Sequence, residues 1–217
     1  MPGNSRDCAL SRTNLAQVAR LSLSDRCDPD DFRRTQCVLS ELQQWEDRGE
    51  IELYYFDEAG FSQRSAIPYA WTPIGKALEL LAYSHSKRLN VLGFLSRKGK
   101  LIYHDTTGKV TTAVVLEAFD SLLKAKAPEE FVIVVMDNAS MHRSAEFMRQ
   151  RAAWRDQRLY VLFLPAYSPE LNLIEILWRK IKYTWLPVTA YRTFDELCNY
   201  VRQILSSYGD KYRIIFS

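Results

Sequence analysis

The pattern of apolar and polar residues changes period several times along the chain. A three-to-four spacing of apolar residues predicts helices with one buried face over 29–48, 111–126, 143–155, 168–185 and 193–208. Short runs rich in β-branched and aromatic residues predict strands at 51–57, 88–96, 100–105, 131–137 and 159–165. The chain therefore carries both kinds of element in a defined order.

That order predicts an α/β fold. Strands joined by a turn at 97–99 come first, and an irregular or edge strand is expected at 65–77, where two prolines interrupt the pattern. Strands then alternate with helices, which predicts βαβ units that add parallel strands to an antiparallel group. The result is a mixed sheet flanked by helices, the architecture of RNase H-like domains.

The chain divides into three predicted parts. Residues 1–27 show no sustained period and are expected to be irregular. Residues 28–49 form a predicted helical linker, which Gly49 ends. Residues 50–217 form the predicted α/β domain.

Composition is consistent with one ordinary domain plus an appendage. The chain has 217 residues, of which 47% are hydrophobic, enough to fill a sizeable core. No apolar run reaches the roughly 18 residues of a membrane span, so no membrane partner is expected. The four cysteines show neither metal-ligand nor disulfide spacing, which favours free thiols and a cytoplasmic location.

The net charge of +3 is unevenly distributed. Residues 1–50 carry 7 Lys/Arg and 9 Asp/Glu, which leaves 22 and 17 for the rest of the chain. The predicted domain is therefore mildly basic, which is compatible with a polyanionic partner such as nucleic acid.

Three carboxylates stand in unusual places. Asp57 and Asp137 each follow a predicted buried strand, and Glu175 lies within the apolar face of the 168–185 helix. Carboxylates gathered at the carboxyl ends of strands repel one another unless a cation lies between them. Mg²⁺ prefers such oxygen ligands, and two ions can support an in-line phosphoryl displacement.

Simpler interpretations stay open for each acid alone. A strand-terminal aspartate often caps a turn or helix. Glu175 can lie at the edge of the apolar stripe or pair with Arg179, four residues on. Glu170 is a rival third acid, but Ser168 suits a helix N-cap and Pro169 the first helical position, so Glu170 is expected at the helix start.

Three blocks resemble a known family. YYFDEAGFS (54–62), VVMDNASMHRS (134–144) and LPAYSPELNLIEILW (164–178) closely resemble the signature blocks of mariner-like DDE transposases, nearest to the insertion-sequence 630 family. AWTPIG (70–75) and YRIIFS (212–217) extend the resemblance over about residues 28–217.

The resemblance implies a catalytic triad of Asp57, Asp137 and Glu175 that binds two Mg²⁺ or Mn²⁺ ions. The 37 residues between the last two acids are close to the spacing of that family. It further implies DNA cleavage and strand transfer at the terminal inverted repeats of an insertion sequence. The target would be DNA at TA sites, and a homodimer on DNA in the bacterial nucleoid is expected.

The sequence departs from the family in two places. Leu173 stands where the family usually has proline. Only about fifty residues precede the first block, without the helix-turn-helix modules that read terminal repeats, so a truncated or frameshifted frame is expected. Two alternatives follow: a catalytically inactive remnant that binds DNA or a full-length subunit, and a host RNase H-like nuclease or resolvase.

Several other side chains are candidates for contact with DNA. Asn138 and His142 follow the second aspartate closely enough to reach the ions or a phosphate, and His142 is expected to orient a neighbour or contact DNA. The predicted DNA-binding residues are Trp71, Lys76, His142, Arg143, Arg179 and Lys182.

Overall fold

A computed structural model describes residues 29–63, 87–139, 142 and 144–216. Within these ranges, one mixed sheet has the strand order β3-β2-β1-β4-β5. The strands are β1 (Glu52–Ser62), β2 (Arg88–Ser96), β3 (Leu101–Thr106), β4 (Val132–Met136) and β5 (Leu159–Phe163). The first three are antiparallel, whereas β4 and β5 extend the sheet in parallel on the other side of β1. The predicted mixed sheet is confirmed.

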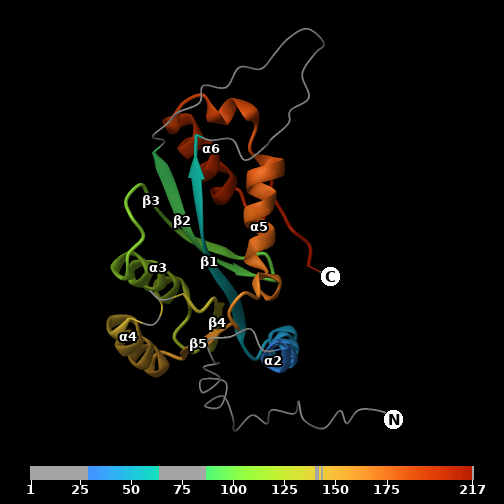
Figure 1. Ribbon diagram of the computed structural model, residues 1–217. Helices are drawn as coiled ribbons and strands as arrows, with labels where there is room; N and C mark the ends of the chain where they lie inside the picture. Colours follow the sequence, from blue (N-terminus) through green and yellow to red (C-terminus); the bar gives the residue numbers. More distant parts are fainter. Residues whose placement is uncertain (1–28, 64–86, 140–141, 143, 217) are drawn as a thin grey trace.

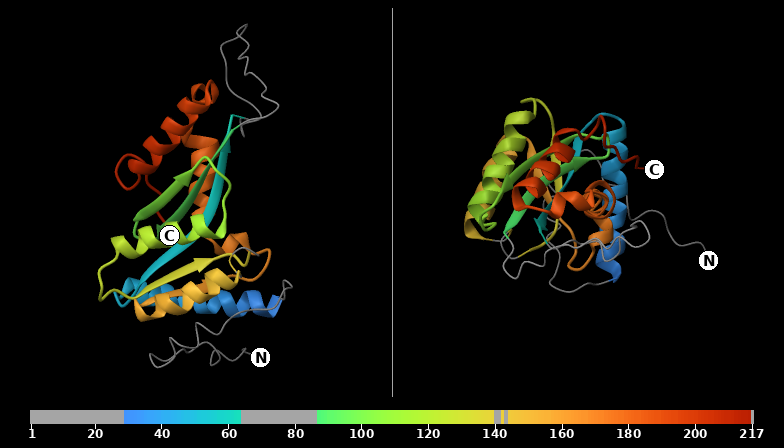
Figure 2. Two further views of the ribbon diagram at one scale, coloured as in Figure 1. Left: turned by 90° about the vertical axis from the view of Figure 1, so that its left-hand side faces the viewer. Right: turned by 90° about the horizontal axis from the view of Figure 1, so that it is seen from above.

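Helices cover both faces of the sheet (Figures 1 and 2). One face carries α3 (Thr112–Ala125) and α4 (Ala145–Asp156). The other carries α2 (Pro29–Asp47), α5 (Ile174–Lys180) and α6 (Phe194–Ser206). Side chains alternate along each strand, so the sheet divides the apolar interior into two cores.

Local capping explains why three of these helices begin where they do. The side-chain oxygens of Thr111, Ser144 and Thr193 each accept a hydrogen bond from a backbone N–H in the first turn of α3, α4 and α6. Each satisfies one N–H group that the helix itself leaves without a partner. The helices predicted at 111–126, 143–155 and 193–208 are confirmed to within two residues at either end.

The prediction that the first strand stops at Asp57 is wrong. β1 continues to Ser62, because β2 pairs with it from Tyr54 through Ser62. Its pairing with β4 on the other edge, however, ends at Tyr55. Asp57 therefore lies within a strand at the point where one of its two neighbours has ended.

The prediction of one continuous helix over 168–185 is also wrong. The segment contains a 3₁₀ turn (Pro169–Leu171), then α5, then a π-helical turn, η4 (Ile181–Trp185). The break falls at Asn172, whose φ of −101° and ψ of 97° are extended. The predicted capping bond of Ser168 is not made, because its hydroxyl instead donates to the carbonyl of Ala166.

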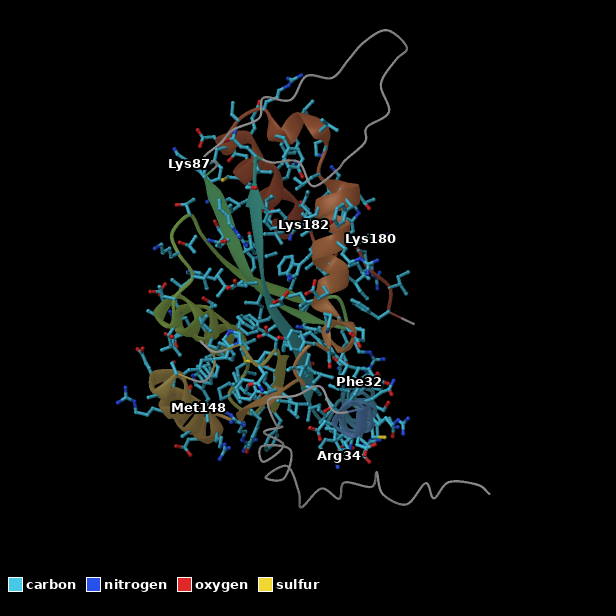
Figure 3. The ribbon with its side chains drawn as sticks, in the orientation of Figure 1. Phe32, Arg34, Lys87, Met148, Lys180 and Lys182 are labelled. Carbon is cyan, nitrogen blue, oxygen red and sulfur yellow. The ribbon has the colours of Figure 1, made fainter. Side chains whose placement is uncertain are left out.

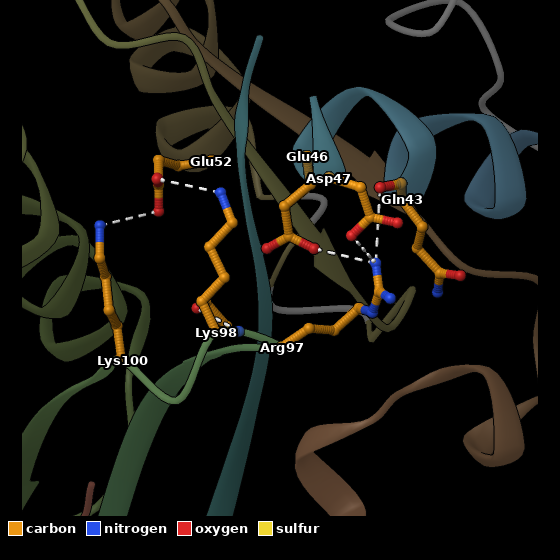
Figure 4. Close-up of polar contacts among 8 residues, drawn as sticks. Gln43, Glu46, Asp47, Glu52, Arg97, Lys98 and Lys100 are labelled. Atoms are coloured by element: carbon orange, nitrogen blue, oxygen red, sulfur yellow. Dashed lines mark hydrogen bonds and ion pairs between the residues drawn. The ribbon is translucent and has the colours of Figure 1, made fainter. Parts of the chain in front are cut away.

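Helix α2 is joined to the hairpin turn between β2 and β3 by a buried polar contact (Figure 4). Arg97 Nη1 lies 3.3 Å from Glu46 Oε2 and 3.2 Å from Asp47 Oδ1. Burial raises the pKa of Glu46, which is 1% exposed, and the positive charge of Arg97 counteracts this. Leu42 and Trp45 on the same helix enter the core beside α5.

Some predicted segments lie outside the described residues, namely 1–27 and 65–77. The division of the chain into an N-terminal segment, a linker and a catalytic domain stays a prediction. Within the described ranges, none of the helices has both the length and the apolar character needed to cross a membrane.

Gly93 allows α5 to approach the sheet closely. It lies opposite Asp57 in the β1–β2 pairing. A Cβ atom at this position would lie 2.8 Å from the Trp178 ring and 3.0 Å from Ile174 Cδ1. Both contacts are with buried side chains of α5, the helix that carries Glu175. The missing side chain therefore sets how near Glu175 comes to Asp57.

Gly93→Ala is expected to lower the free energy of unfolding by about 1–2 kcal/mol, because an added methyl group overpacks the β2–α5 contact. Urea unfolding followed by circular dichroism measures this. Gly108→Ala is the matched control, since a Cβ atom there meets only Thr106 Oγ1 at 3.4 Å. Equal stabilities of the two variants would contradict the close-approach role of Gly93.

Candidate active site

Asp57 and Asp137 lie level with one another on neighbouring strands. The parallel register pairs Tyr55 of β1 with Val135 of β4, and two further residues bring Asp57 beside Asp137. Tyr55 and Val135 both face the core beneath α5, and alternation along the strands directs both aspartates to that same face. The predicted juxtaposition of these two carboxylates thus follows from the register.

Glu175 reaches the same place from α5. It is the second residue of that helix and is half-buried. Asp57, Asp137 and Glu175 line one cavity of about 470 Å³, which also has Asn138 and Asn172 in its wall. The structure thereby brings together the three acids singled out from the sequence.

Asp57 is the acid most affected by its surroundings. The pKa of Asp57 is raised to about 7, first by burial and then by the negative charges of Glu175 and Asp137, while the hydrogen bond from the Glu58 N–H counteracts them. Without a cation, the three acids therefore do not all carry full charge at neutral pH.

Asp137 is stabilised in its charged form by His142. Burial raises the pKa of Asp137, but the hydrogen bond and charge of His142 and the N–H of Ala139 outweigh it, so the net shift is downward. His142 Nδ1 lies 2.9 Å from Asp137 Oδ1. The imidazole is 6% exposed and packs against the rings of Phe56 and Phe147. His142 therefore lies where it can orient Asp137.

His142→Ala is expected to slow metal-dependent DNA nicking by about 10–100-fold, because the loss of a partner that orients a metal ligand typically has this effect. Plasmid nicking rates measure it. His104→Ala is the control, since His104 lies on β3 and its Nε2 is 3.7 Å from Glu117 Oε2, away from the cavity. Equal rates for the two variants would rule out an orienting role for His142.

Lys182 is a basic residue close enough to these acids for their charges to affect its pKa. Burial lowers the pKa of Lys182, and the charges of Glu175 and Asp57 counteract this. Its Nζ lies 5.6 Å from the centre of the Phe61 ring in β1. Figure 3 shows Lys182 on the sheet side of its helix and Lys180 on the opposite side.

The residues present fit a divalent cation. Hard cations bind carboxylate oxygens, and three carboxylates line this cavity; burial and the charges of the other two raise the pKa of one of them, Asp57. Within the part of the chain that the structure describes, no three acidic, histidine or cysteine side chains lie close enough together to hold a metal ion without moving.

Other predicted site residues have different positions. Trp71, Lys76 and Arg143 lie outside the described residues. Arg179 is exposed and lines a separate hollow with Tyr183, on the outer side of α5 and η4. Glu170 is exposed in the 3₁₀ turn and does not line the cavity, as expected for a helix-start residue.

Two residues of the cavity wall were missed by sequence reasoning. Tyr167 is 89% exposed and has a φ of +58°, a conformation that is uncommon for a bulky residue. Asn172 is buried and bonded to β1. Asparagine next to a helix start was a usable signal for Asn172, but it indicates a cap, not a bond to a distant strand.

Comparisons with known proteins show the family of the chain. The family model described as DDE superfamily endonuclease matches residues 52–198, more than half of the chain. The chain belongs to the DDE superfamily endonuclease family. The matched range includes Asp57, Asp137 and Glu175. Curated proteins gave no match.

Solved structures similar to this DDE superfamily endonuclease include complexes of Mos1 transposase. The Mos1 mariner paired end complex with Mn gives a TM-score of 0.56 at 14% identity. The matched region covers 92% of this chain and 63% of the Mos1 chain. The Mos1 strand transfer complex gives 0.55 at 14% identity, with 92% and 63% covered. This chain thus spans less than two thirds of those proteins.

The crystal structure of the catalytic domain of Mos1 mariner transposase is also similar, with a TM-score of 0.51 at 14% identity. The matched region covers 85% of this chain and 84% of the Mos1 domain. Likeness at such identity establishes the fold. The predicted RNase H-like fold is confirmed.

Proposed function

We propose that the chain is the catalytic domain of a transposase of the insertion-sequence 630 branch of the mariner-like family. It cuts DNA at the terminal inverted repeats of an insertion sequence and transfers the freed strand to target DNA at TA sites. The observation that carries the proposal is the convergence of Asp57, Asp137 and Glu175 on one cavity.

The three carboxylates hold two Mg²⁺ or Mn²⁺ ions in this proposal. When bound, such ions activate the attacking oxygen and stabilise the leaving oxygen of an in-line displacement at phosphorus. Asp57 and Asp137 bind from the sheet, and Glu175 completes the ligand set from α5. His142 keeps Asp137 ionised and oriented through its 2.9 Å contact.

The reaction is a phosphoryl transfer at a DNA phosphodiester. A water oxygen forms a new bond to phosphorus as the bond to the 3′-oxygen breaks, and the departing 3′-oxygen gains a proton. In the second step this 3′-hydroxyl takes the place of water and attacks a phosphodiester of the target strand. The bond from that phosphorus to its own 3′-oxygen breaks, and this departing oxygen takes up the proton that the attacking hydroxyl loses. The chain must therefore position two different oxygens in the same cavity.

Basic side chains would bind the phosphates. Among the predicted DNA contacts, Lys182 lies near the acids, since the charges of Glu175 and Asp57 act on its amino group. Arg179 lies on the outer side, where a duplex could pass. We further propose that the protein acts as a homodimer on DNA in the cytoplasm, at the bacterial nucleoid.

Related structures support DNA as the partner. One of them is described as Mos1 transposase in a paired-end complex with a left transposon end, and others contain Mn or Mg. The mildly basic domain is compatible with such a partner.

The test is an assay with duplex DNA that carries the element's terminal repeats, in Mg²⁺ and in EDTA. Metal-dependent nicking at the repeat ends is the expected result. Binding of the repeats without nicking would contradict the catalytic proposal and favour an inactive remnant. Preferential cleavage of RNA–DNA hybrids would favour a host nuclease instead.

A further inference from the structure

Asn172 makes an unexpected connection between two parts of the cavity. It lies at the break between the 3₁₀ turn and α5 and is 4% exposed. An asparagine at a helix start ordinarily turns its side chain back to cap the first-turn N–H groups. Here the Nδ2 group instead donates to the carbonyl oxygen of Phe56 in β1, at 3.0 Å.

Two of the hydrogen bonds of Asn172 join the surroundings of two acids. Phe56 immediately precedes Asp57 and is the first residue of β1 beyond its pairing with β4. The backbone carbonyl of Asn172 also accepts a hydrogen bond from the N–H of Glu175, at 3.1 Å. One residue therefore connects the strand that carries Asp57 to the helix turn that carries Glu175.

The remaining polar atom of this side chain shows that its orientation is set by the bond to β1. Asn172 Oδ1 is buried and has no hydrogen-bond partner among the described residues. The Phe56 carbonyl can only accept, so the amide orientation is fixed and the oxygen is the atom left over. A buried acceptor without a partner is costly, and Asn172 lines the acidic cavity.

We propose that Asn172 is a positioning residue that fixes the separation of Asp57 and Glu175 for cation binding. This inference rests on the proposed function. In it, the Nδ2 bond holds the start of α5 against β1. Asn172 itself is not a metal ligand.

The experiment measures Mn²⁺ affinity of the DNA-free protein by calorimetry, together with the thermal midpoint without metal. Asn172→Leu keeps the branched shape and removes both polar atoms, and Asn172→Ala avoids any clash if the leucine variant does not fold. Either is expected to weaken Mn²⁺ binding about 10–100-fold, the usual effect of losing a group that orients a ligand.

Val201→Ala is the matched control, because Val201 is fully buried on α6, outside the cavity wall. It is expected to lower the thermal midpoint and leave Mn²⁺ affinity within twofold of wild type. A folded Asn172 variant with wild-type Mn²⁺ affinity would overturn the inference. Absence of Mn²⁺ binding by the wild-type protein would instead overturn the proposed function.

Discussion

Replacement of Asp57, Asp137 or Glu175 by alanine is expected to reduce metal-dependent DNA nicking by at least about 10³-fold. Each substitution removes a carboxylate from a cavity where cations supply several kcal/mol of transition-state stabilisation, and each 1.36 kcal/mol is tenfold in rate. The three losses are not additive, since the acids act as one unit. Single-turnover nicking of terminal-repeat DNA measures them.

Glu170→Ala is the matched control for these variants. Glu170 is an acid in the same segment, five residues before Glu175, but it is exposed and lies outside the cavity wall. Its nicking rate should stay within a few-fold of wild type. An equal loss for Glu170→Ala, or full activity of Glu175→Ala, would show that the third acid has been assigned to the wrong residue.

Asp57→Asn is expected to stabilise the metal-free protein at neutral and higher pH. The pKa of Asp57 is about 7 in the folded protein, against an ordinary value of 3.8. Between these values the folded state holds a proton that the unfolded state has lost, so stability falls as pH rises from about 4 to 7. Asparagine abolishes this dependence.

The expected gain of Asp57→Asn over wild type is roughly 2 kcal/mol at pH 8, about half of the full linkage value because the carboxylate is partly solvated. It should vanish near pH 4. Denaturant unfolding at several pH values measures the difference between the two proteins, in which other titrating groups cancel. A constant difference across this range would disprove strong burial of the Asp57 charge.

Added Mn²⁺ should reverse the order of the two proteins. A ligand that binds only the folded state stabilises it in proportion to its affinity, and wild type retains the carboxylate that Asp57→Asn lacks. Greater stabilisation of the asparagine variant by Mn²⁺ would be incompatible with Asp57 as a ligand.

The sequence predicted most of the strands because their patterns are local. The run from Val132 to Met136 is buried on both faces, and its composition alone indicates a central strand. The relation of Asp57 to Asp137 also followed, since both lie just beyond the parallel pairing of β1 with β4, although β1 itself continues past Asp57.

The parts that could not be predicted depend on distant partners. β1 extends beyond Asp57 because β2 pairs with its far half, and no local signal marks that. The helix over 168–185 breaks at Asn172, which bonds to a carbonyl 116 residues earlier in the chain. A periodic pattern reports which face is buried, but it carries no information about such a bond.

The central claim is that Asp57, Asp137 and Glu175 form one divalent-cation site. Calorimetric titration of the DNA-free protein with Mn²⁺ tests it most directly. We expect binding by wild type and Glu170→Ala, and its loss in each of Asp57→Asn, Asp137→Asn and Glu175→Gln. Unchanged Mn²⁺ affinity in any of these three variants would contradict the claim.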